Sequence, residues 1–147
     1  KHILKFTFKN HTPIIVSYSL CNIIGRIILG QKAGAFALFP FIIVRDNSFL
    51  EKIDIIQHES IHLRQYMETL FVGLIIIGLV QYLYARCILR KSKIDSYYFM
   101  SHEQEANQND QDKEYLKNRK LFAYYKYLLP QHKKQITLID GKRVIIS

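Results

Sequence analysis

Two histidines four residues apart, with a glutamate beside the first, are the residues of this chain best suited to chemistry. They are His58 and His62, with Glu59 between them, in the pentapeptide His-Glu-Ser-Ile-His. On a helix, residues four apart lie on one face, so both imidazole rings reach a single metal ion from adjacent turns. The pattern is typical of a zinc site that activates a water molecule, with Glu59 as the general base that takes its proton.

A catalytic zinc site needs a third protein ligand and one open position for water. No histidine lies within four to ten residues after His62, so we searched the ligand-type residues further downstream. They cluster in the segment Ser-His-Glu-Gln-Glu-Ala-Asn over residues 101–107. Glu103 and Glu105 in this cluster point about 200° apart on a helix, so one of them is expected to bind the metal. His102 is a weaker alternative.

The motif and the downstream cluster resemble those of the gluzincins, zinc metallopeptidases whose third ligand is a glutamate. In the HtpX-like integral-membrane branch of that group, alanine follows this glutamate after three residues and aspartate after four. Glu103, Ala106 and Asn107 match the spacing, with asparagine in place of aspartate. The resemblance implies that Glu103 is the third ligand and Glu105 the fallback. Asn107 would support Glu103 by a hydrogen bond, but it cannot carry the charge of aspartate.

Residues 35–125 also resemble a group of small proteins from Bacteroidota-type bacteria. The matching pieces are the strand Phe39–Ile43, the helix His58–Glu68, the apolar stretch Leu70–Ala85 and the late segment Glu103–Ala106. This resemblance implies a zinc-peptidase-like fold and indicates no substrate.

The elements that must position these residues begin with a β-rich region over residues 3–44. Ile3–Phe8 alternates apolar and polar residues, and Ile14–Leu29 is rich in Ile, Val and Tyr, which predicts a small antiparallel sheet. Ala35–Val44 lies where gluzincins carry an edge strand that holds the substrate backbone. Pro40 is compatible with an edge strand or a bulge. An ordinary core strand is an equal alternative for this segment.

Helices are expected to carry the ligands. Ser48 and Glu51 match a capping box, which predicts a helix from about Phe49 to about Leu89. Gln65 lies one turn after His62 on the same face, where it would support the site.

A second helix is predicted from near residue 102 to residue 129, where Pro130 stops it, and a break at residues 109–110 is the alternative to a continuous helix. Residues 136–146 match a terminal hairpin with its tight turn at residues 140–141. We therefore predict a single α+β domain over residues 1–147 with a zincin-like fold, in which the motif helix packs on the helix that bears Glu103.

The charge and the apolar residues indicate a membrane surface rather than nucleic acid as a partner. The formal charge is +9, but the basic residues are dispersed and form no recognised nucleic-acid motif. They are more frequent just after the apolar run Leu70–Ala85. The sixteen residues of this run form ~24 Å of helix, which is shorter than the ~30 Å hydrocarbon core of a membrane. We predict that the helix over residues 70–89 associates with a membrane, on the cytoplasmic side of an inner membrane. A buried core helix in a cytoplasmic protein is the alternative.

The function predicted from these features is a zinc-dependent metallopeptidase that hydrolyses peptide bonds, with Glu59 as general base and a peptide or protein as substrate. The resemblance to gluzincins implies that a later histidine or tyrosine stabilises the oxyanion, and the sequence does not distinguish Tyr97, Tyr98, Tyr115 and the other tyrosines for this role. The alternative is a non-catalytic, membrane-associated subunit of a larger assembly that retains a zinc site. A fourth protein ligand would close the site and favour this alternative.

Overall fold

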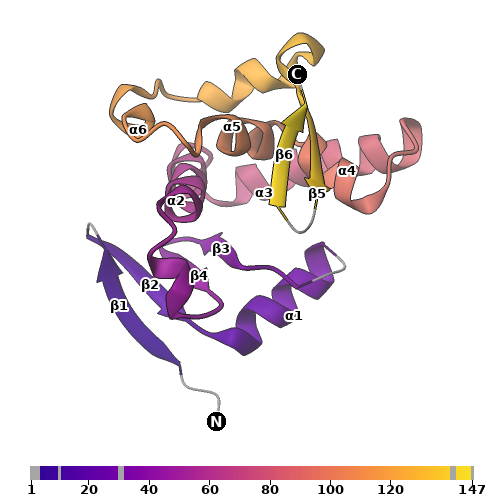
Figure 1. The fold of residues 1–147 in the computed structure, drawn as a ribbon. Helices are drawn as coiled ribbons and strands as arrows, with labels where there is room; N and C mark the ends of the chain where they lie inside the picture. Colours follow the sequence, from indigo (N-terminus) through magenta and orange to yellow (C-terminus); the bar gives the residue numbers. More distant parts are fainter. Residues whose placement is uncertain (1–3, 10, 30–31, 140–141, 147) are drawn as a thin grey trace. The chain divides into compact units, whose positions relative to one another are not determined.

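The chain has the predicted α+β composition (Figure 1). Four strands and a helix occur in its first part, and a series of helices followed by two strands occurs in its second part. The structure is a computed structural model that describes residues 4–9, 11–29, 32–139 and 142–146. The chain folds as two compact units, residues 1–64 (the N-terminal unit) and residues 65–147 (the C-terminal unit). The division falls within helix α2 (Ile53–Glu68), which is continuous across it.

The N-terminal unit contains a four-stranded sheet in the order β1-β2-β4-β3. Its strands are β1 (Lys5–Lys9), β2 (Thr12–Val16), β3 (Ala35–Leu38) and β4 (Phe41–Val44). β1 pairs antiparallel with β2, and β3 with β4, but β2 and β4 are parallel, with Ile14 opposite Ile42. The prediction of an antiparallel sheet is therefore wrong at the centre. The chain between β2 and β4 returns to the starting end of the sheet, so β4 runs in the direction of β2.

Residues 18–28, which we predicted as strand, form helix α1 (Tyr18–Ile28). Ser17 ends β2 with a backbone bond to the Val44 carbonyl, and its hydroxyl accepts a hydrogen bond from the Leu20 N–H at 3.4 Å. Ser17 is thus the N-cap of α1. Cys21 and Gly25, four residues apart, form the buried side of the helix. The Ile-rich composition favoured a strand. The Ser17 cap and the four-residue spacing of the buried positions Cys21 and Gly25 are instead features of a helix.

The segment from Ala35 to Val44 is a hairpin rather than one strand. β3 is an edge strand of the sheet, whereas β4 lies inside it and is buried at Ile42, Ile43 and Val44. Pro40 lies in the turn between the two strands. β3 is thus the predicted edge strand and β4 the core strand of the alternative, while the role of β3 in holding a substrate stays a prediction.

The core of the N-terminal unit joins the sheet to the helix that carries the motif. The buried side chains that form it are Ile14, Val16, Ile42, Val44, Phe49 and Ile56. Gly34 allows Phe49 to enter, because a Cβ atom at residue 34 would lie 2.2 Å from the Phe49 ring. Ile56 belongs to α2, so the sheet fixes the first turns of this helix directly beside His58.

Helix α2 begins at Ile53, and the predicted capping box of Ser48 and Glu51 is wrong. A short 3₁₀ helix (Asn47–Leu50) precedes it, and Asp46 caps that helix by accepting from the Ser48 N–H at 3.0 Å. Asp46, two residues before Ser48, is therefore the N-cap residue, and the backbone N–H of Ser48 is the group that it caps.

The long helix predicted to run to Leu89 is interrupted after α2. The Phe71 N–H donates to the Tyr66 carbonyl at 2.8 Å, and Leu70 and Phe71 adopt positive φ angles of 51° and 64°. This left-handed geometry ends a helix. The chain resumes as α3 (Val72–Leu83) and a π-helical turn (Tyr84–Ile88). Within the described residues, no single helix is long and apolar enough to cross a membrane, and only α2 with residues 72–88, as a bent pair, meets those criteria.

The rest of the C-terminal unit consists of short helices and a hairpin. The predicted helix over residues 102–129 is divided into α5, α6 and a 3₁₀ helix. Its first break, at the end of α5, is the one left open at residues 109–110, whereas the later breaks and α4 were not predicted. The bounds of these helices are α4 (Lys93–Phe99), α5 (Ser101–Asn109), α6 (Tyr115–Asn118), and two 3₁₀ helices (Ala123–Leu128 and Pro130–His132). Strands β5 (Gln135–Ile139) and β6 (Lys142–Ile146) pair antiparallel, which confirms the terminal hairpin; its predicted turn at residues 140–141 lies outside the described residues.

Candidate metal centre

The His-Glu-x-x-His motif lies in the N-terminal unit, on α2 as predicted. His58, Glu59 and His62 are all buried. The Nε2 atoms of the two histidines lie 3.2 Å apart, and the rings meet edge to face. Two ring nitrogens brought together one helical turn apart can both bind one metal ion.

Cys21 of α1 is the nearby thiol, and its environment keeps it protonated. Burial, and then the negative charge of Glu59, raise the pKa of Cys21 to about 12. A protonated thiol is neither a nucleophile nor a good metal ligand. The chemistry of the N-terminal unit therefore rests on the two histidines and Glu59.

The acidic cluster lies in the C-terminal unit, on α5. This helix is unusual because most of its polar side chains are buried: Ser101, Glu103, Gln104, Glu105 and Asn107. Burial of polar groups is costly unless each finds a hydrogen-bond partner, so their partners define what each side chain does.

Glu103 is held from one side by Asn107. The Asn107 amide donates to the backbone carbonyl of Glu103 at 2.7 Å and to its carboxylate at 3.4 Å. Arg143 of β6 donates to the Asn107 side-chain oxygen at 2.7 Å and pairs with Asp110 at 3.2 Å. The hydrogen bond expected between Asn107 and Glu103 is thus present. The positively charged Arg143 in turn binds the side-chain oxygen of Asn107.

The charge of Glu103 also affects the pKa of Tyr98. Burial, and then the charge of Glu103, raise the pKa of Tyr98 to about 12. Its phenol therefore stays protonated and able to donate near neutral pH. Tyr97, Tyr98 and Tyr115 were among the candidates for such a donor, and Tyr115 instead donates to Glu105 at 3.0 Å.

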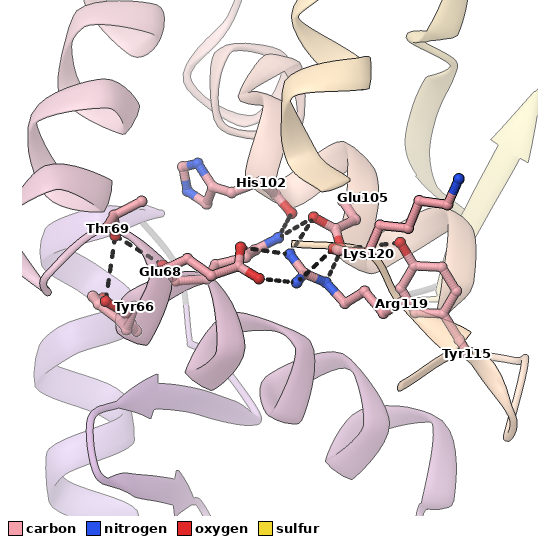
Figure 2. A network of polar contacts seen from close by, with 9 residues as sticks. Tyr66, Glu68, Thr69, His102, Glu105, Tyr115, Arg119 and Lys120 are labelled. Atoms are coloured by element: carbon pink, nitrogen blue, oxygen red, sulfur yellow. Dashed lines mark hydrogen bonds and ion pairs between the residues drawn. The ribbon is translucent and has the colours of Figure 1, made fainter. Parts of the chain in front are cut away.

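Glu105 is the centre of a buried network in the C-terminal unit (Figure 2). Its carboxylate accepts hydrogen bonds from the Gln65 amide at 2.9 Å, from Tyr115, and from the Arg119 guanidinium at two points. Arg119 also forms a two-point ion pair with Glu68 of α2. Gln65 donates in addition to the His102 carbonyl at 3.1 Å. Both oxygens of Glu105 are therefore occupied by protein donors.

The ring of His102, the weakest candidate ligand, packs against α3. A Cβ atom at Gly78 would lie 2.8 Å from the His102 ring, so glycine is required for this close approach. The side chain of His102 thus faces a different neighbour from the carboxylate of Glu105.

Arg119 is the residue of this network that sequence reasoning missed. It lies between Lys117 and Lys120, in a stretch rich in basic residues. Its side chain is 4% exposed. Burial alone lowers the pKa of Arg119, but the hydrogen bonds and charges of Glu68 and Glu105 outweigh it and raise the pKa above its usual value. The only prior signal was its type, because a planar guanidinium pairs with two carboxylates as lysine cannot.

Replacement of Arg119 by methionine is expected to destabilise the protein by ~3–5 kcal/mol, because it leaves two buried carboxylates without their cation. The loss is measurable by urea denaturation. Lys117→Met is the matched control, since its ion pair with Glu114 is largely exposed and worth less than ~1 kcal/mol. Equal stabilities of the two variants would contradict a structural role for the network.

Comparison of the chain with protein-family models, with curated proteins and with solved structures gave no significant match. The assignment of function therefore depends on the side chains themselves.

Proposed function

We propose that this protein is a metal-dependent peptidase in which His58, His62 and Glu103 bind one zinc ion. The observation that carries the proposal is the buried histidine pair of α2, whose Nε2 atoms lie 3.2 Å apart next to Glu59. Two imidazoles and one carboxylate are the ligand set of a well-known class of catalytic zinc sites, which keeps its fourth position for water.

The choice of Glu103 as third ligand is supported by two features. Among the described residues, the one group of three His, Cys, Asp or Glu side chains suited to a metal ion consists of His58, His62 and Glu103. Glu105, the fallback, already accepts four hydrogen bonds from Gln65, Tyr115 and Arg119. A carboxylate so engaged is a poor competitor for a metal ion.

The chemistry assigned to the chain's own residues is proton transfer and orientation. A zinc ion held by His58, His62 and Glu103 would supply Lewis acidity and would lower the pKa of a water molecule. Glu59, directly after His58, would serve as the general base and then as the proton donor to the leaving amine. Asn107 donates to Glu103, and Tyr98, whose pKa is raised by burial and by the charge of Glu103, would be a protonated donor.

The substrate class we propose is an extended peptide. β3 is an edge strand, and its free backbone groups can pair with a further strand. Such pairing recognises backbone and not side chains, so it suits a peptidase whose substrate enters in extended form.

Metal analysis of the purified protein tests the proposal. Wild-type protein is expected to hold about one zinc ion per chain, and His58→Ala a small fraction of that, because the metal loses one of three ligands. His132→Ala, a histidine of the last 3₁₀ helix, is the control and should match wild type. Equal zinc in wild type and His58→Ala would refute the site. Zinc binding without hydrolysis of a fluorogenic peptide library would favour the non-catalytic subunit instead.

A further inference from the structure

Helix α3 is apolar on both of its faces. The inner face is buried at Leu74 and Gly78. The opposite side, called here the outer face of α3, is exposed to between 48% and 62% at each position. The residues of this outer face are Val72, Ile75, Ile76, Leu79, Val80 and Leu83.

The outer face does not have the composition of a water-exposed helix face. A surface helix of a soluble protein carries charged or polar residues opposite its buried stripe, and a helix that is apolar all round is normally covered. Here the spacing of three and four residues places six aliphatic side chains in one row. Contiguous apolar patches of this kind mark a contact with a partner or a membrane.

The charges at the end of the row identify what covers it. No acidic residue occurs from Leu70 to Ile94, whereas four basic residues follow the row: Arg86, Arg90, Lys91 and Lys93. Arg86 and Arg90 are exposed, and Arg86 is three residues after Leu83 along the helix. A surface complementary to the apolar row and to the basic residues after it would thus be apolar in its interior and negatively charged at its boundary.

We infer that the outer face of α3 docks the C-terminal unit on an anionic lipid bilayer. The aliphatic row enters the boundary between headgroups and acyl chains, and Arg86 and Arg90 bind lipid phosphates. With 12 residues, α3 is ~18 Å long and shorter than the ~30 Å hydrocarbon core, so it lies in the plane of the interface. Tyr84, 48% exposed at the end of the row, has the amphipathic ring favoured at headgroup level.

A second copy of this chain complements the surface less well. Its outer face would bring the same four positive residues and no negative one, so the two copies would repel at the ends of the row. A lipid headgroup layer supplies the missing negative charge together with the apolar surface.

Vesicle co-sedimentation tests the inference and needs no metal or enzyme activity, so it is independent of the proposed peptidase. The full chain is expected to bind vesicles of phosphatidylcholine mixed with phosphatidylglycerol, and to bind pure phosphatidylcholine more weakly. The double variant Ile76→Glu with Val80→Glu should bind ~100-fold more weakly, because it places charge in the apolar row. The control is Phe6→Glu with Phe8→Glu, two exposed apolar residues of β1, and it should bind like wild type.

The charge contribution has its own pair of variants. Arg86→Glu with Arg90→Glu should weaken binding by ~30-fold or more at low salt, and the difference should shrink as salt screens the headgroups. Lys117→Glu with Lys126→Glu makes the same change in net charge at exposed positions elsewhere in the C-terminal unit and should have little effect.

A tryptophan at position 79 reports docking in the folded protein. The chain contains no Trp, so Leu79→Trp introduces a single fluorophore, and its emission should shift to the blue when anionic vesicles are added. Failure of wild type to bind either kind of vesicle would overturn the inference. So would a wild-type dimer that the Ile76→Glu and Val80→Glu changes dissociate, because a second copy would then be the occupant.

Discussion

Glu59→Gln is expected to keep its zinc and to lose peptide hydrolysis by ~10²–10⁴-fold. Glutamine has the shape of glutamate but cannot accept the proton of the attacking water, so the general-base contribution disappears. The side chain is buried beside the histidine pair, where solvent cannot easily replace it. The two measurements are zinc content and the initial rate on a fluorogenic peptide.

Glu51→Gln is the matched control, because Glu51 is exposed two residues before α2 begins. It should leave both the zinc content and the rate unchanged. Loss of zinc from Glu59→Gln would mean that Glu59 is a ligand and not the base. A rate equal to wild type would exclude Glu59 from the chemistry altogether.

Glu103→Ala and Glu105→Ala are expected to affect different properties. Loss of Glu103 removes a ligand, so the dissociation constant for zinc should rise by more than ~100-fold, beyond the ~10–100-fold typical of groups that only orient ligands. Loss of Glu105 removes the acceptor of the Tyr115 hydroxyl and one of two acceptors of the Gln65 amide, and it leaves Arg119 with one carboxylate instead of two. The unfolding midpoint of Glu105→Ala should therefore fall while its zinc affinity stays near that of wild type.

Competition of each variant with a chromogenic chelator measures the zinc affinity, and thermal denaturation of the same samples measures stability. The contrast between the two variants matters more than either value, since both remove one buried carboxylate from the same helix. The reverse order of zinc affinities would transfer the ligand role to Glu105.

Local signals determined what could be predicted from the sequence. The helix over His58 and His62 was predicted from its motif, and the hairpin of β5 and β6 from two apolar runs around a turn. Each of these elements is specified by residues close together in the chain. The zincin-like arrangement remains a prediction, as does the assignment of the zinc ligands.

The sequence predictions were wrong where a competing local signal, or a residue distant in the chain, determined the structure. Asp46 took the capping role assigned to Ser48, and the hydroxyl of Ser17 started a helix in a segment with strand composition. The parallel pairing of β2 with β4 depends on how the chain crosses the sheet, which residue patterns do not record. Apart from its residue type, Arg119 had no sequence signal, because its two acidic partners lie 51 and 14 residues away.

The parallel pair at the centre of the N-terminal sheet has a consequence for the order of folding. The hairpins β1-β2 and β3-β4 each join neighbours in sequence and can form early, but Ile14 must find Ile42 across a long loop. Pairing of this kind is slow, and the buried core exists only once it is complete. Ile56 packs into that core two residues before His58, so we expect the histidine pair to reach its final geometry late, after the two hairpins have docked.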